Sequence, residues 1–356
     1  MVGTWAARVP ALQERAGVST ATLGLALAGL AAGALVAMPI SGWRTARVGS
    51  RRTTLVCATG LVIALPLPAL ATSAAGLILG AVALGAANGG IDVAMNAHGV
   101  EVERQLGRPI LSSLHACFSL GGLVGAAIGA VLAGAGVDVR VNFAAIALVM
   151  AAAALAAAPR LLPSKADAAP PGGRLAFPPR SLWPLGLIAF CCMLAEGAAA
   201  DWSAVYLHGP LGAGAGVAAL GFTAFSIAMT SARLVGDRLT LRAGAVRLVR
   251  GGALLATAGL GAALVIAEPP AAIAGFALLG AGVAVIVPSV FRAAGTARGV
   301  TPGTALAAVT TAGYSGFLVG PPIIGAIAGV TSLPAALTLV LVATGIVAAL
   351  APRVAA

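Results

Sequence analysis

The sequence predicts an all-α membrane protein that crosses the bilayer many times, and three observations lead to this fold class. Hydrophobic residues make up 60% of the chain and charged residues 9%, with a mean hydropathy of +1.04, whereas a soluble domain carries roughly 25% charged residues. Apolar runs of about 20 residues, the length of a membrane-spanning helix, recur along the chain. The 48 glycines suit helices that pack closely in lipid, and the short alternating segments of a membrane β-barrel are absent from the sequence.

Eleven complete spans are expected from the apolar runs. Several of them contain proline, for example Pro39, Pro66 and Pro288, which membrane helices tolerate because neighbouring groups satisfy the freed backbone. The expected spans are 20–42, 53–71, 75–98, 111–135, 141–158, 182–206, 217–236, 247–267, 271–293, 303–329 and 333–351.

The basic residues predict the orientation of these spans. Alternate loops hold 18 of the 21 Lys and Arg residues, and loops rich in these residues stay in the cytoplasm. The C-terminus is therefore expected to be cytoplasmic, in a multi-pass protein of the inner membrane. The pI near 11.3 reflects this bias, and no nucleic-acid partner is expected because the charges are spread over short loops.

An internal repeat organises the chain. "LGA" at 84–86 recurs at 279–281, "RVGSRR" at 47–52 recurs as "RAGAVR", and "GGLVG" at 121–125 recurs as "GFLVG", all with an offset of 195 residues. Each repeat unit holds six spans, so both units have the same orientation. The expected domains are an N-terminal bundle at 1–158, a Pro-rich cytoplasmic linker at 159–180 and a C-terminal bundle at 181–356.

The beginning of the chain departs from this repeat. Trp5 matches Trp202 and Leu23 matches Leu220, each with an offset of 197 residues. The partner of the span that contains Trp202 would begin before residue 1. The first helix is therefore expected to be largely missing, either because the start codon was placed too late, which is favoured, or because the protein is truncated.

The stretch "GWRTARVGSRR", Gly42–Arg52, resembles the loop 2–3 signature of the major facilitator superfamily. It departs from the signature at Ala46, where an acidic residue is usual. In the second half, "ARLVGDRLTLRAG" keeps an acid, Asp237, one turn from Arg233, and this pair could serve the same gating contact or form a solvated helix end. The resemblance implies a gating role for Gly42, Arg47, Gly49, Arg51, Arg52, Arg233 and Asp237.

Longer stretches resemble the MosC/YbjJ-like branch of that superfamily. They include "GTWAARVPALQERAGVS", "DVAMNAHGVEVERQLGRPILSSLHACFSLGG", "AEGAAADWSAVYL" and "GPPIIG". The resemblance implies the major facilitator fold, with two parallel six-helix bundles that rock about a central site. It also suggests sugar or polyol derivatives as solutes.

Polar residues inside two spans are the candidate binding residues. Asn88, Asp92 and Asn96 have the spacing i, i+4, i+8 and share one helix face. A charge in the hydrocarbon region is costly, so Asp92 is expected to turn toward a solute or proton site. The alternative is a structural hydrogen bond from Asp92 to Ser112, Ser113 or His115.

The seventh span of a full count offers a second set. Glu196 falls near mid-depth and is the candidate proton carrier, while Asp201 and Trp202 lie closer to the outer face. Trp202 could stack on a sugar-like ring or anchor at the interface, and Tyr206 is expected to be an interfacial anchor.

These features predict a secondary active transporter of a small polar, sugar-like solute, coupled to protons and working by alternating access as a monomer in the bilayer. The alternatives are an efflux carrier for amphiphilic compounds and a non-transporting membrane sensor or fragment. No enzyme activity, cofactor or metal is expected. The sequence has no nucleotide-binding loop of the form G-x-x-x-x-G-K-[ST], no metal-ligand spacing and no nucleophile–base pair.

Overall fold

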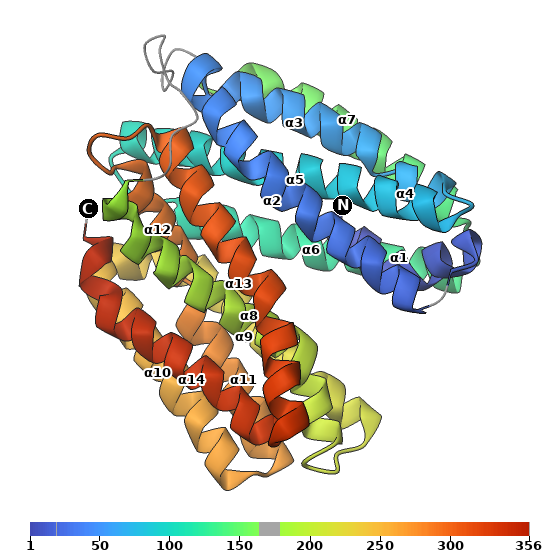
Figure 1. Cartoon of the computed structure of the whole chain (residues 1–356). Coiled ribbons are helices and arrows are strands. Elements are labelled where there is room, and N and C mark those ends of the chain that lie inside the picture. Colours follow the sequence, from blue (N-terminus) through green and yellow to red (C-terminus); the bar gives the residue numbers. More distant parts are fainter. Residues whose placement is uncertain (19, 164–178, 356) are drawn as a thin grey trace. The chain divides into compact units, whose positions relative to one another are not determined.

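The computed structural model describes residues 1–18, 20–163 and 179–355. Every regular element in this part of the chain is a helix (Figure 1). Ten of the helices or helix pairs are long and apolar enough to cross a membrane. The fold-class prediction of an all-α membrane protein is confirmed. Most of the expected linker, residues 164–178, lies outside the described residues.

The described residues of the first half of the chain form seven α-helices and a short 3₁₀ helix. Their bounds are α1 Val2–Ala16, α2 Thr20–Val48, α3 Ser50–Ala64, α4 Leu67–Leu70, α5 Ala74–Leu106, α6 Leu111–Gly134, α7 Val139–Ala157 and η1 Ala158–Arg160.

In the second half, the part from residue 179 to 355 forms seven further α-helices and two 3₁₀ helices. Their bounds are η2 Arg180–Leu182, α8 Trp183–His208, α9 Ala215–Ala243, α10 Ala245–Ile266, α11 Pro269–Val283, α12 Ile286–Gly295, α13 Pro302–Val330, α14 Leu333–Leu350 and η3 Ala351–Val354.

All eleven expected spans are helical, but two of them are broken. The span expected at 53–71 is α3 followed by α4, with the break at Pro66. The span expected at 271–293 is α11 followed by α12, and the break lies just before Pro288. Proline lacks the N–H group that an unbroken helix would bond to the carbonyl four residues earlier, and its ring clashes with that carbonyl. Both breaks therefore follow from the sequence.

Helix α1 continues to Ala16, where Gly17 ends it in the left-handed conformation with φ of 62°. The sequence predicted that the first helix is largely missing, and the structure has a helix of 15 residues in this segment. Its inner face contributes Trp5 and Leu12 to a core with Phe143 of α7, and the rings of Trp5 and Phe143 lie 6.5 Å apart.

The repeat is visible in the backbone itself. Gly49 separates α2 from α3 with φ 84° and ψ 157°, and Gly244 separates α9 from α10 with φ 79° and ψ 150°. Gly17 and Gly212 form a second pair, with φ of 62° and 65°. Members of each pair are 195 residues apart, and a positive φ is readily available only to glycine. The duplication predicted from the sequence therefore extends to two turn conformations.

The described residues form two compact units. The first comprises the described residues of 1–102, 117–163 and 300–307, and the second comprises 103–116, 179–299 and 308–355. The segment 103–116, which ends α5 and begins α6, thus groups with the helices of the second half of the chain. This segment carries the polar network described below.

Candidate functional site

In the second unit, the carboxylate of Glu196 on α8 is paired with Arg233 on α9. The distance from Arg233 Nη2 to Glu196 Oε1 is 3.5 Å, and the side chains are 8% and 17% exposed, respectively. The thiol of Cys192, one turn earlier on α8, lies 3.8 Å from the same carboxylate oxygen. The expected proton carrier, which lies in the apolar helix α8, therefore has a cationic partner on α9.

The break between α11 and α12 explains how Arg233 is held. Pro288 cannot donate a hydrogen bond to the carbonyl of Ala284, four residues earlier. That carbonyl instead accepts a bond from Arg233 Nε, at 3.2 Å. The proline in the sequence thus creates a backbone acceptor that orients the guanidinium toward Glu196.

The other two candidates on α8 lie farther along the helix. Asp201 is exposed, and the ring of Trp202 lies beside Gly325 of α13, where an added Cβ would meet it at 3.3 Å. Tyr206 is fully buried, so the expectation that it anchors at the membrane interface is wrong. Tyr206 packs inside the second unit.

In the first unit, the three expected polar residues lie on α5. Asn96 is buried, and its side-chain amide donates to the backbone carbonyl of Asp92 at 2.8 Å and to its carboxylate at 3.1 Å. Asn88 and Asp92 are half-buried. The predicted i, i+4 relation between Asp92 and Asn96 is therefore a direct side-chain contact.

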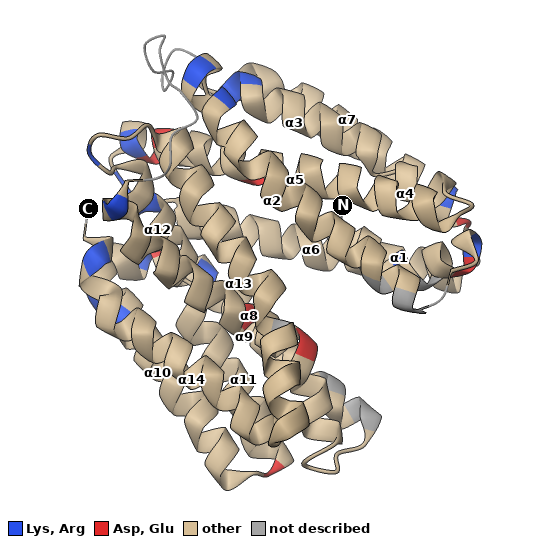
Figure 2. Cartoon of the chain, viewed as in Figure 1, with Lys and Arg blue, Asp and Glu red and all other residues tan. Residues whose placement is uncertain are grey.

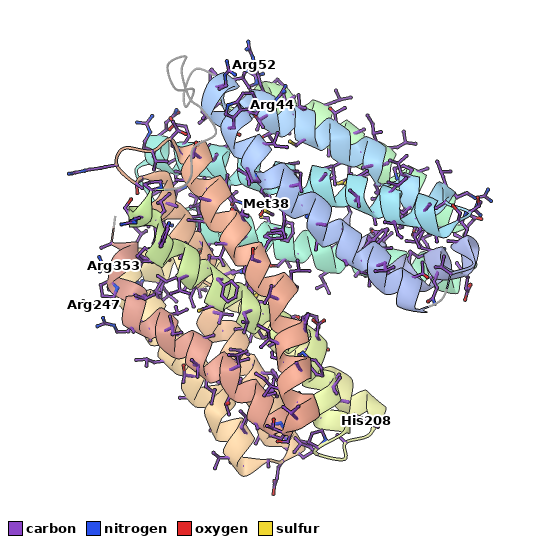
Figure 3. All side chains as sticks on the ribbon, in the orientation of Figure 1. Met38, Arg44, Arg52, His208, Arg247 and Arg353 are labelled. Carbon is purple, nitrogen blue, oxygen red and sulfur yellow. The ribbon has the colours of Figure 1, made fainter. Side chains whose placement is uncertain are left out.

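The residues of the expected gating loop lie around the turn between α2 and α3. Gly42 packs so closely against Gly303 and Ala307 that it leaves no room for a side chain. The Arg47 guanidinium lies 4.9 Å from the centre of the Trp43 ring. Arg51 donates to the carbonyl of Ala158 at 3.0 Å. Ala46, in the place of the usual acid, is buried, whereas Arg44 and Arg52 are exposed near this turn (Figure 3).

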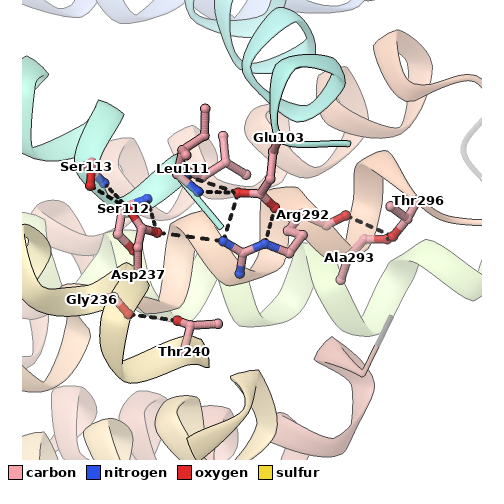
Figure 4. Close-up of polar contacts among 11 residues, drawn as sticks. Glu103, Leu111, Ser112, Ser113, Gly236, Asp237, Thr240, Arg292, Ala293 and Thr296 are labelled. Carbon is pink, nitrogen blue, oxygen red and sulfur yellow. Dashed lines mark hydrogen bonds and ion pairs between the residues drawn. The ribbon is translucent and has the colours of Figure 1, made fainter. Parts of the chain in front are cut away.

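Asp237, the acid of the second half, caps the start of α6 (Figure 4). Its carboxylate accepts hydrogen bonds from the backbone N–H groups of Ser112, at 3.0 Å, and Ser113, at 2.8 Å, and from the Ser113 hydroxyl, at 2.6 Å. The first amides of a helix have no partner within the helix. Ser112 and Ser113, which the sequence offered as partners for Asp92, therefore bind Asp237.

Glu103 caps the same helix from the other side. Its carboxylate accepts from the N–H groups of Ile110, at 2.8 Å, and Leu111, at 3.1 Å. Arg292 of α12 lies between the two carboxylates. Its Nε and Nη2 atoms bind Glu103, and Nη2 lies 3.8 Å from Asp237. Four successive amides and one guanidinium thus neutralise two buried carboxylates.

We call Glu103, Asp237, Arg292, Ser112 and Ser113 the α6 capping network. The sequence predicted a role for Asp237 but missed the other four as members of the network. Among the described residues, no cluster of three or more His, Cys, Asp or Glu side chains could hold a metal ion.

These features define a class of protein: a helical membrane protein with an internal duplication, carboxylates inside its spans and a charged network at its helix ends. The family model of the Major Facilitator Superfamily matches residues 3–298, and the chain belongs to that superfamily.

Two curated relatives show the branch. An uncharacterized MFS-type transporter of Yersinia pestis is 38% identical over 336 residues, which is 94% of this chain and 87% of the relative. The membrane protein MosC of Rhizobium meliloti is 35% identical over 99% of this chain and 86% of its own length. The predicted membership of a MosC-like branch is confirmed, and a relative named as a transporter supports the expectation that the chain is not an enzyme.

Solved structures show the same fold. The fucose:proton symporter FucP of E. coli is 15% identical, with a TM-score of 0.75 over 99% of this chain and 95% of that one. A bacterial homologue of the iron transporter ferroportin, solved in an outward-facing state, is 13% identical, with a TM-score of 0.76 and the same two coverages.

Proposed function

We propose that this secondary transporter couples the movement of a small polar, sugar-like solute to protons by alternating access. The observation that carries the proposal is the Glu196–Arg233 pair. A buried ion pair costs desolvation energy that hydrophobic residues would avoid, so it is weak evidence for a purely stabilising role. A carboxylate that must release and rebind a proton supplies a reason for the pair.

The pair has two states that differ by one proton. Arg233 keeps its charge at any physiological pH, so protonation of Glu196 removes the attraction and leaves the guanidinium on the Ala284 carbonyl, which it already binds. The charge balance of α8 then changes while Arg233 stays fixed. Proton binding at Glu196 can in this way alter the preference of α8 for one state of the carrier.

Asp92 supplies the polar contact for the solute in this proposal. It is half-buried on α5, and the side-chain amide of Asn96 donates a hydrogen bond to its carboxylate. Asp92 belongs to the first unit and Glu196 to the second. Solute binding at Asp92 and proton binding at Glu196 are proposed to favour the same state of the carrier, which would link the two events. The fucose:proton symporter with the same fold is a precedent for such solutes.

The α6 capping network is proposed as part of the gate. Helices α5 and α6 otherwise group with the first unit, yet their adjoining ends, within 103–116, group with the second. In the proposed gating step, the start of α6 separates from α9 and α12, which releases the bonds of Ser112 and Ser113 to Asp237 and the ion pair of Glu103 with Arg292. We propose release, because the amide donors of a helix N-terminus can be satisfied by water instead.

The test uses the purified full chain in liposomes that contain a pH-sensitive dye. L-fucose, myo-inositol and related sugars are screened for proton uptake into the vesicles, and the responding solute is then followed by radiolabel. Glu196→Gln is expected to abolish accumulation driven by a pH gradient and to retain solute exchange, because exchange needs no net proton movement. Asp92→Asn is expected to weaken the binding of the same solute.

Glu268→Gln is the matched control, because it removes an exposed carboxylate of the same unit. It should leave both accumulation and exchange unchanged. Accumulation by Glu196→Gln at the wild-type rate would refute the coupling role. Efflux of ethidium without any sugar-linked proton signal would favour the amphiphile carrier.

A further inference from the structure

An apolar pocket lies between the beginning of α8 and the part of α13 that starts at Ala308, both within the second unit. Its volume is about 340 Å³, within the range of roughly 300–1,000 Å³ typical of small-molecule sites. Gly186 lets α8 and α13 approach closely beside the pocket, because an added Cβ there would lie 3.3 Å from the Ala312 side chain. The lining residues are Leu182, Trp183, Gly186, Leu187, Phe190, Ala308 and Ala312.

The lining excludes the solute proposed above. The only polar side-chain atom that it offers is the indole nitrogen of Trp183, so a polyhydroxylated molecule would lose its hydrogen bonds to water on entering. A hydrocarbon chain makes no hydrogen bonds to water that it could lose, and its binding is favoured by about 0.8 kcal/mol for each methylene group taken from water. The pocket therefore fits an acyl chain.

An interfacial aromatic lines the pocket, and a positive charge lies close to it in the sequence. Trp183 is 63% exposed, and tryptophan favours the boundary between headgroups and acyl chains. Arg180 is exposed and precedes the pocket residue Leu182 by two positions in η2, a rise of about 4 Å. Because Arg180 is exposed, its charge is accessible to a phosphate group.

Further arginines strengthen the positive potential at this end of the unit. η3 packs against both α8 and α10, and it carries the exposed Arg353. Arg247 on α10 is labelled near Arg353 in Figure 3. Figure 2 shows basic residues gathered where α8 begins, while an acidic residue marks the opposite end of the unit. Basic clusters at the ends of membrane helices attract anionic headgroups.

We propose that this pocket is a binding site for an anionic phospholipid, with one acyl chain between α8 and α13 and the phosphate on Arg180. The acyl chain supplies affinity, and the charge supplies selectivity over zwitterionic lipids. Trp183 is the first residue of α8 and Leu182 directly precedes it, and Glu196 lies at the middle of the same helix. A lipid bound at the beginning of α8 is therefore placed to stabilise the helix in one of the positions that it takes during transport. The site is separate from the proposed solute site and does not depend on it.

The experiment measures contact between Trp183 and brominated acyl chains, which quench tryptophan fluorescence on contact. The full chain is placed in nanodiscs of phosphatidylcholine that contain a minor fraction of brominated phosphatidylglycerol or brominated phosphatidylcholine. The signal of Trp183 is the difference between the wild type and Trp183→Phe. Stronger quenching of this signal by the anionic lipid at equal mole fraction is expected.

Two substitutions separate the charge from the pocket. Arg180→Gln should lower the preference for the anionic lipid about five-fold, since one arginine near the surface contributes about 1 kcal/mol. Ala308→Leu, which fills the pocket, should lower quenching by both lipids. The controls are Arg247→Gln, which removes a charge from α10 at the same end, and Ala258→Leu, which enlarges an exposed residue of α10. Ala258→Leu should match the wild type, and Arg247→Gln should lower the preference much less than Arg180→Gln does.

Circular dichroism and gel filtration establish that each variant is folded before quenching is compared. Equal quenching by the two brominated lipids would overturn the proposal, and so would an equal effect of Arg180→Gln and Arg247→Gln, because general membrane charge would then explain the result. A different outcome is that excess inorganic phosphate abolishes the preference for the anionic lipid while Ala308→Leu leaves the quenching unchanged. That result would mean that Arg180 binds free phosphate and would refute the lipid site.

Discussion

Replacing Asp237 by asparagine tests whether the α6 capping network depends on two full carboxylates. Each oxygen of Asp237 faces a backbone donor, one from Ser112 and one from Ser113. An asparagine has one acceptor oxygen and one NH₂ group, so in either orientation its NH₂ points at an N–H donor. The substitution changes no volume, and the effect therefore measures charge and hydrogen bonding alone.

The expected loss of stability follows from these contacts. One charge-assisted hydrogen bond of about 1.5–3 kcal/mol is lost, and one buried N–H is left without an acceptor. The contact with Arg292 Nη2 at 3.8 Å also weakens. We expect Asp237→Asn to lower the free energy of unfolding by about 3 kcal/mol. Ser113→Ala removes only the hydroxyl bond and should cost about 1 kcal/mol.

The assay is equilibrium unfolding of the purified protein in mixed micelles, titrated with SDS and followed by circular dichroism. The double variant Asp237→Asn/Ser113→Ala completes a cycle, and its loss should be smaller than the sum of the single losses because both changes act on one carboxylate. A loss below about 0.5 kcal/mol for Asp237→Asn is the range of ordinary surface substitutions and would show that water or another group replaces these bonds.

Three further predictions concern other parts of the chain. With the native cysteines replaced, Arg298→Cys should be labelled from the cytoplasm and Gly214→Cys from outside, as measured with an impermeant maleimide on intact cells; the reverse result would invert the predicted topology. Hydrogen bonds from Arg140 hold the pKa of Asp138 at about 2, below its unfolded value near 4. The ionised Asp138 carboxylate therefore stabilises the folded state above about pH 4, and this stabilisation is lost as the pH falls toward 2. Asp138→Asn should flatten the pH–stability curve between these two pH values. Gly282→Ala would press a methyl group on a carbonyl of α10 and should cost about 1–3 kcal/mol in the SDS titration, whereas wild-type stability would mean that α10 and α11 separate easily.

The fold could be predicted from the sequence because membrane solvation constrains every residue of a span. Composition and the length of the apolar runs were enough to place eleven helices, and the prolines at 66 and 288 mark the two breaks. The consequence of Pro288 could not be predicted in the same way. The sequence grouped Arg233 with Asp237, four residues apart, but the structure brings Arg233 to Glu196 because α8 and α9 pack together.

The α6 capping network shows why part of the site was missed. Glu103 and Arg292 are 189 residues apart, and Ser112 and Asp237 are 125 residues apart, so no local spacing connects them. An acid seven residues before Ile110, where a new helix starts after Pro109, is a local signal for a cap. Its cationic partner becomes visible only when the helices are placed. Tyr206 shows a different limit of sequence reasoning. Its position near the end of a span predicted an anchor at the membrane interface, but the packing of the neighbouring helices buries its side chain.

The capping network also has a consequence for biosynthesis. During translation the start of α6 leaves the ribosome 125 residues before Asp237, which at roughly 5–20 residues per second is an interval of about 6–25 seconds. During that time Glu103 can already accept bonds from Ile110 and Leu111, which are close in sequence, whereas Ser112 and Ser113 have no carboxylate yet. In the nascent chain, only the Glu103 side of the α6 cap can form. The remaining bonds form after Asp237 and then Arg292 have been synthesised. Insertion of the second half is in this sense the last folding step of α6.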